Sequence, residues 1–88
     1  MHSKGAALEV LLREFRDDTN SIEVRRMLPV AIGELIKAQD VSGDTFQVLK
    51  NALKDEDEQI WRNSGRALGK GKLSGEQARE VYSEQRIE

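Results

Sequence analysis

The chain carries the same helical pattern twice, and this internal repeat limits its possible folds more than any other feature. Residues 8–18 align with 46–56, and residues 24–33 align with 60–69, with apolar, basic and acidic positions in the same order. The offsets are 38 and 36, so the first copy has two extra residues near its predicted turn. A turn tolerates insertion because loop-closure entropy grows slowly with length. Such a period is typical of repeat architectures, whose units bury apolar faces against one another.

Each copy predicts two helices from apolar residues spaced three and four apart. The first copy should bury one side of each helix, leave Val10 off the stripe, and bend its second helix at Pro29, which cannot donate a backbone hydrogen bond. No segment alternates with period two for long enough to predict a sheet. The residues expected to face inward are Leu8, Leu11, Leu12, Phe15, Val24, Met27, Leu28, Ala31, Ile32 and Leu35 in the first copy, and Phe46, Leu49, Ala52, Leu53, Ile60, Ser64, Ala67 and Leu68 in the second.

Helix starts are marked by capping residues. Asn20, followed three residues later by Glu23, resembles a capping box. Two similar tetrapeptides, at 41–44 and 73–76, each place a serine and an acid where a helix should begin. The acidic run 55–58 suits the positive N-terminus of the fourth helix.

The sequence also predicts where the fourth helix ends and a fifth begins. Gly69-Lys70-Gly71 should end the fourth helix with a glycine in the left-handed conformation. A short fifth helix should then follow over about 75–86, with only a thin apolar stripe of Ala78, Val81 and Tyr82.

These elements predict an all-α fold of two stacked antiparallel helical hairpins plus a C-terminal helix. The expected repeats cover about residues 6–38 and 44–70 of a single domain, 1–88. Repeat arrays usually need at least three units for stability. Two and a half units therefore suggest a fragment of a longer array, a small capped protein, or a chain that completes its core as a homo-oligomer. A compact five-helix bundle of the death-domain kind also fits the length, although the repeat would then be coincidental.

Within residues 8–72, each copy has leucine in its first helix, an acidic turn, an aliphatic-x-Arg segment and a closing Ala-aliphatic-Gly. With this pattern the segment resembles HEAT repeats, especially the short HEAT-like repeats of the bilin-lyase type, which implies an α-solenoid. Departures from the family pattern are Trp61 where arginine is usual, Pro29 within a helix, and the polar Asn63 and Ser64. The matching residues are Leu11, Phe15, Asp17, Val24, Arg25, Ala31, Ile32 and Gly33 in the first copy, and Leu49, Leu53, Asp55, Asp57, Ile60, Arg62, Ala67, Leu68 and Gly69 in the second.

In a stack of such hairpins, the second helix of each pair would line a groove. The residues expected to point into this groove are Arg26, Gly33, Arg62, Arg66 and Gly69. Arg62, Arg66 and Lys70 recur every four residues and could bind an acidic peptide or a phosphate. The spacing favours a simpler interpretation, a solvated helix face on which Glu58 balances Arg62 four residues later.

Trp61 is the only tryptophan and lies at the edge of its helix's apolar stripe. We expect it to pack between hairpins, with an exposed interface anchor as the alternative.

The sequence predicts no catalytic residue, metal site or cofactor. His2 is the only histidine, and the chain has no cysteine. The acidic run 55–58 lacks the glycine and alternating ligands of a calcium loop, and residues 69–72 lack the frame of a phosphate loop.

Composition indicates a cytoplasmic protein, with no apolar run long enough to cross a membrane. With a third of its 88 residues charged and a net charge of only −2, the chain has no bulk attraction to nucleic acid.

We therefore expect a non-enzymatic scaffold that binds another protein through Arg26, Trp61, Arg62, Arg66 and Lys70. Nucleic-acid binding is the less favoured alternative, by resemblance to the concave surfaces of HEAT-like alkylpurine glycosylases. A third possibility is an accessory subunit resembling bilin-lyase proteins, with the chemistry supplied elsewhere. The partner, the pathway and the binding face are not determined by the sequence.

Overall fold

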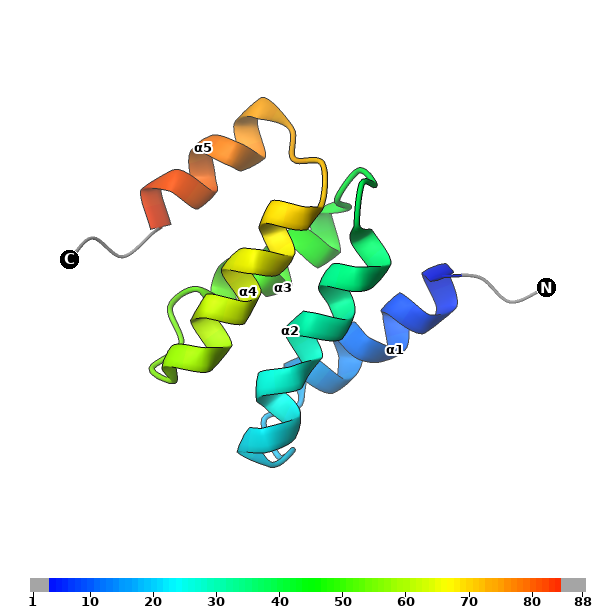
Figure 1. Cartoon of the computed structure of the whole chain (residues 1–88), viewed down its shortest axis with the longest axis vertical. Helices are drawn as coiled ribbons and strands as arrows, with labels where there is room; N and C mark the ends of the chain where they lie inside the picture. The colour runs from blue at the N-terminus through cyan, green and yellow to red at the C-terminus, as the bar shows by residue number, and fades with distance from the viewer. Residues whose placement is uncertain (1–3, 85–88) are drawn as a thin grey trace.

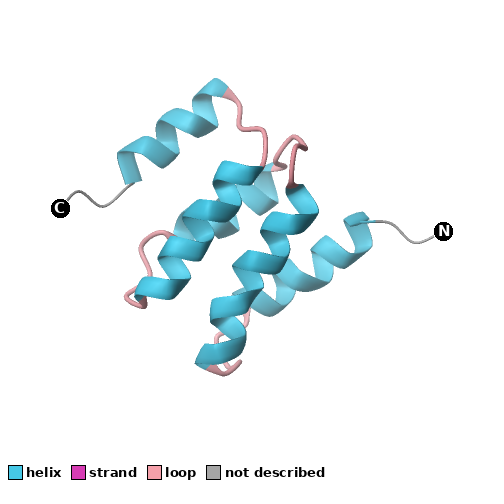
Figure 2. Ribbon diagram, viewed as in Figure 1, coloured by secondary structure: helices cyan, strands magenta, loops and turns pink. Residues whose placement is uncertain are grey.

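The fold is all-helical, as predicted. The computed structural model describes the backbone of residues 4–84, which contains no strand and only an isolated bridge between Asp40 and Lys72 (Figure 2). The helices are α1 (Lys4–Arg16), α2 (Ile22–Ile36), α3 (Gly43–Ala52), α4 (Glu58–Lys70) and α5 (Gly75–Glu84).

The helices form two layers. In Figure 1, α2 and α4 lie side by side in front and run in the same direction, with α1 behind α2 and α3 behind α4. The most extensive helix contact joins α2 to α4, while α1 packs on α2 and α3 packs on α4. The back layer continues from α1 to α3 and from α3 to α5. The second hairpin therefore sits beside the first, and α5 follows α3 as α3 follows α1.

The core lies between the layers and confirms most of the predicted stripes. In α1, Val10 is exposed as expected, whereas Leu8 and Leu11 are only partly buried against the core. All four inward positions of α4 are buried, including the polar Ser64. The buried apolar side chains are Leu12, Phe15, Leu28, Ile32, Ile36, Val41, Phe46, Leu49, Leu53, Ile60, Ala67 and Leu68.

The stripe predicted for α2 is partly wrong. Val24 is 43% exposed and Met27 is 60% exposed, whereas Gly33 and Ile36 are buried. The reason is that α2 has neighbours on two sides, α1 and α4. The buried face of α2 therefore lies closer to α4 than the apolar stripe in the sequence indicated. The helix continues through the buried Pro29, as predicted.

The caps follow the sequence at α3, α4 and α5 but not at α2. Ser42 and Asp57 each accept a hydrogen bond from the amide three residues later. Ser74 does the same for the amide of Gln77, and the side-chain oxygen of Gln77 accepts a hydrogen bond from the Ser74 amide.

The N-cap of α2 is Ser21, not Asn20. The side-chain amide of Asn20 instead donates to the backbone carbonyl of Glu14 at 3.0 Å, near the end of α1. Its side chain therefore closes the preceding helix, a role that the capping-box spacing did not reveal.

The predicted left-handed glycine after α4 is also wrong. Gly71 caps α4 with φ −85° and ψ 172°, and Ala38 is the residue with positive φ, 58°, in the described chain. A Cβ on Gly71 would overlap Cγ2 of Val41. Glycine is needed here because two turns meet, rather than because the backbone is left-handed.

The meeting turns are 37–42 and 71–74, which follow the two front helices. The amide of Lys72 donates to the carbonyl of Gln39 at 2.7 Å, and the amide of Val41 donates back to the carbonyl of Lys72 at 3.2 Å. The amide of Ala38 also donates to the carbonyl of Lys70 at 2.9 Å. These bonds tie the end of one hairpin to the end of the next.

The fifth helix presents little apolar surface to the core. Val81 is partly buried, Ala78 is exposed, and Tyr82 is 80% exposed. The described part of α5 ends at Glu84, and the predicted residues 85 and 86 lie outside the described chain. None of the described helices is long and apolar enough to span a membrane.

Candidate functional site

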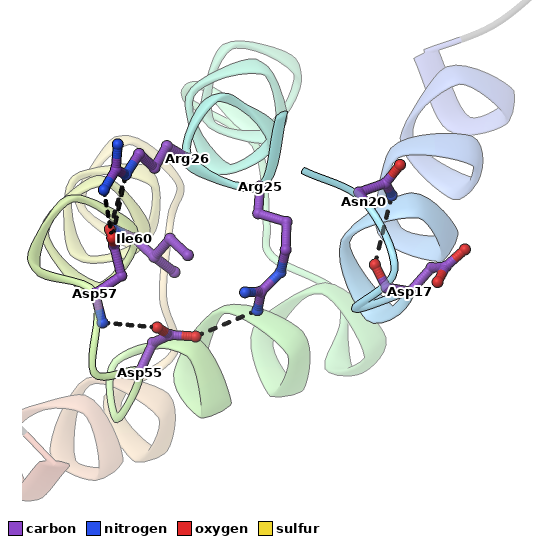
Figure 3. Close-up of polar contacts among 7 residues, drawn as sticks. All are labelled: Asp17, Asn20, Arg25, Arg26, Asp55, Asp57 and Ile60. Carbon is purple, nitrogen blue, oxygen red and sulfur yellow. Dashed lines mark hydrogen bonds and ion pairs between the residues drawn. The ribbon is translucent and has the colours of Figure 1, made fainter. Parts of the chain in front are cut away.

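The contact between α2 and α4 is fixed by Arg26, a predicted binding residue. Its guanidinium donates to both carboxylate oxygens of Asp57, with the shortest contact 2.7 Å (Figure 3). Asn63 donates from its side chain to the carbonyl of Arg26 at 2.9 Å. Arg26 therefore joins the two front helices and is not displayed as a free cation.

Asp57 serves both helices at once. It accepts the amide of Ile60 at 3.0 Å as the N-cap of α4 and also accepts the Arg26 guanidinium. The hydrogen bond from Arg26 lowers the pKa of Asp57, an effect aided by the Ile60 amide and opposed by desolvation. The same hydrogen bond raises the pKa of Arg26. The pair is thus ionised at neutral pH.

A second arginine reaches the same turn from α2. Arg25 donates to Asp55 at 3.3 Å, and the other oxygen of Asp55 accepts the amide of Asp57 at 2.8 Å (Figure 3). Adjacent arginines of the first hairpin therefore hold the acidic turn of the second. The sequence suggested only a capping role for these acids.

Gly33 does not line an open groove, contrary to the sequence prediction. It is buried, and a Cβ on it would lie 3.1 Å from both Cα and Cβ of Ala67. Glycine here lets the backbones of α2 and α4 approach closely. Gly69, predicted for the same groove, has open space where its Cβ would be.

The predicted basic line on α4 is largely neutralised. Arg62 pairs with Glu58 at 2.7 Å, with both side chains more than half exposed, as the solvated-face interpretation expected. Lys70 pairs with Glu34 of α2, and hydrogen bonding from this lysine lowers the pKa of Glu34. Arg66 is exposed.

Two hollows adjoin arginines described above, one at Arg66 and the other at Arg25. One, of about 160 Å³, lies between α2 and α4 and is lined by Pro29, Val30, Asn63, Arg66, Ala67 and Lys70. A larger one, of about 470 Å³, was not anticipated from the sequence. It lies by α1 and α3 and is lined by Phe15, Arg16, Arg25, Asp44, Gln47, Val48, Asn51 and Ala52.

Trp61 is half-buried, so it is neither fully packed nor freely displayed. The guanidinium of Arg62 lies 5.6 Å from the centroid of its ring, within the range of a cation–π contact. That Trp61 anchors a partner stays a prediction.

The acidic side chains of the described residues do not gather into a metal-binding cluster with one another or with histidine. Among the described carboxyl groups, Asp17, Glu34 and Asp57 have a displaced pKa, and each is lowered. For Asp17 the cause is hydrogen bonding by Thr19. Such acids are ionised at neutral pH, which suits ion pairing rather than proton donation. His2 lies outside the described residues.

No family model, curated protein or solved structure matches this chain.

Proposed function

We propose that this chain is a non-enzymatic, HEAT-like repeat module that binds another protein through the exposed side of α2 and α4. The HEAT-like assignment is supported by the arrangement of the two hairpins. Equivalent helices lie in the same layer, α2 and α4 run in the same direction, and the turns after them are hydrogen-bonded. We also expect a cytoplasmic location.

The observation that supports this surface best is its mixture of apolar and cationic groups. Met27 and Val30 are exposed on α2. Val30 lines the smaller hollow together with Arg66 and Lys70 of α4. An apolar surface edged by cations is typical of a site for a protein segment with both apolar and acidic side chains.

The same charges make nucleic acid a weaker candidate. Arg62 and Lys70 are paired with Glu58 and Glu34, so a phosphate would compete with carboxylates already in place. Nucleic-acid affinity depends on unneutralised cations that displace counterions. We therefore keep nucleic acid as an outcome of the test rather than a second proposal.

The test is affinity capture from source lysate with the chain and its Met27→Glu/Arg66→Glu variant, with and without nuclease. The matched control is Val10→Glu/Arg13→Glu, which makes the same kinds of change at exposed positions of α1. We expect a nuclease-resistant protein that the control captures and the variant does not. Equal capture by both variants would contradict the proposed surface, and nuclease-sensitive capture would replace protein by nucleic acid.

A further inference from the structure

The surface of α2 that receives α4 occurs a second time, on α4 itself. In the internal alignment, Arg26 corresponds to Arg62 and Gly33 corresponds to Gly69. On α2 these two residues make the contacts that seat α4: Arg26 holds Asp57, and Gly33 allows Ala67 to approach. The same pair therefore lies on α4 at the same spacing.

On α4 this pair is open. A Cβ on Gly69 would meet no atom within 4 Å, whereas one on Gly33 would meet Ala67 at 3.1 Å. Arg62 is 55% exposed, and its ion pair is with Glu58 of its own helix. Gly69 lies one residue before the end of α4, and nothing packs on it within the described chain. A helix approaching Gly69 as α4 approaches Gly33 would fill this open space.

The back layer already extends to this position. Ser42 and Ser74 cap α3 and α5 in the same way, so Phe46 and Leu49 of α3 correspond to Ala78 and Val81 of α5. Lys50 of α3 reaches Glu80 of α5 at 2.9 Å. In Figure 1, α5 continues the row of back helices without a helix in front of it. It occupies the place of the first helix of a third hairpin.

We propose that this α4–α5 edge binds one amphipathic α-helix of a partner protein, in the way that α2 and α3 bind α4. The edge is defined by Trp61, Arg62, Gly69, Ala78, Val81 and Tyr82. The partner helix has an acidic N-cap, as Asp57 is for α4, and a small residue ten positions later, as Ala67 is. The acid takes the place of Glu58 on Arg62, since that exposed pair within α4 contributes little. The small residue lies on Gly69.

The occupant is a single helix rather than a second copy of this chain. A second copy stacked as a further hairpin would bring its own α1 to the position that α5 holds. The inference rests on the proposed function only in that the chain is a module that binds protein, and it does not depend on the α2–α4 surface.

The test uses the full chain, labelled with ¹⁵N, and a synthetic peptide with the sequence of residues 55–70. The peptide carries Lys70→Glu. Within the chain, Lys70 of α4 pairs with Glu34 of α2, and the residue of α4 that corresponds to Glu34 is Lys70. An unchanged peptide would therefore place its own Lys70 against Lys70 of the chain, whereas glutamate restores opposite charges. We expect amide shifts at Arg62, Gly69 and Val81 rather than at Met27 and Val30. Absence of binding at millimolar peptide, or shifts confined to Met27 and Val30, would overturn the proposal.

Two variants of the full chain probe the contacts separately. Gly69→Leu fills the open space and should weaken peptide binding roughly tenfold or more, and Arg62→Glu should do the same. A peptide that also carries Asp57→Arg should restore binding to the Arg62→Glu chain. Arg13→Glu on α1 is the charge control and should leave binding unchanged. Equal affinity for the Gly69→Leu chain, or no rescue by the exchanged charge, would refute the docking geometry.

The outcome is distinguishable from that of the proposed function. Arg66→Glu should impair capture at the α2–α4 surface but leave the affinity for the peptide unchanged. Gly69→Leu should instead weaken binding of the peptide. Peptide binding without any effect of Met27→Glu/Arg66→Glu on capture would support the edge and contradict the α2–α4 surface.

Discussion

The two sides of α4 differ in how they use the same residue pattern. On the α2 side, Arg26 and Gly33 are engaged by Asp57 and Ala67, so the pattern holds the fold together. On the far side, Arg62 and Gly69 repeat the pattern but face open space. The comparison teaches that the same motif holds helices together where a neighbouring hairpin covers it and stays exposed where none of the described helices does.

Truncating an apolar side chain should lower the free energy of unfolding much more in the core face of α4 than on α5. Ile60 is fully buried, so Ile60→Ala should lower the free energy of unfolding by about 2–5 kcal/mol. Val81 is only partly buried on α5, so Val81→Ala loses fewer contacts. It should lower the free energy of unfolding by roughly 1 kcal/mol or less. Urea unfolding followed by circular dichroism measures both. Equal losses would mean that α5 is as well packed as α4.

Leucine at the two glycines should give effects of opposite sign. Gly33→Leu forces side-chain atoms against the backbone of Ala67 and should destabilise by roughly 1–3 kcal/mol. Gly69→Leu enters open space and replaces a poor helix former, so it should stabilise by up to about 1 kcal/mol. Thermal and urea unfolding of the two variants test this. A destabilising Gly69→Leu would mean that the far side is not open.

Removing the charge of Asp57 should lower the free energy of unfolding by an amount that depends on pH. Asp57→Asn keeps a good N-cap residue but loses the carboxylate that pairs with Arg26. The folded pKa of Asp57 lies below its ordinary value of 3.8, so its contribution is present above that pH and is lost as the pH falls through the folded pKa.

The measurement is urea unfolding of both chains at pH 7 and at about pH 2. The wild-type chain should be the more stable at pH 7, and the difference should shrink in acid. Glu56→Gln, at an exposed acid of the same turn, is the matched control and should not change the difference. A difference independent of pH would remove the ion pair as its cause.

The smallest effect should come from Arg62. Its pair with Glu58 lies four residues apart on an exposed helix face, so Arg62→Ala should change the free energy of unfolding by about 0.5 kcal/mol or less. Unfolding at low and high salt checks this, because the contribution should vanish with screening. Arg26→Ala should cost more, since its ion pair with Asp57 is less exposed and joins α2 to α4.

The sequence predicted the helices well where capping and apolar spacing agree. Ser42, Asp57 and Ser74 mark three helix starts, and all four inward residues of α4 are buried. It failed at α2 because Met27 lies in a stripe that hydrophobicity favours but that α1 and α4 do not cover. No spacing rule includes the position of a second neighbouring helix.

The candidate site was predicted only in part for the same reason. The sequence grouped Arg26 and Gly33 with Arg62 and Gly69 because the repeat makes them equivalent. The structure separates them, because α4 covers the first pair. The one local signal that was correct was the spacing of Glu58 and Arg62, since residues four apart meet on any helix.

The sequence by itself determined what depends on near neighbours along the chain: five helices, most of their caps, and the repetition of the hairpin. The tertiary structure decided what depends on which surfaces meet. It turned Gly33 and Gly71 into points of close approach, joined Arg26 to Asp57 across 31 residues, and left Gly69 open. The physical reason is that capping and helix periodicity act within a few residues, whereas burial is settled only when helices distant in sequence pack together.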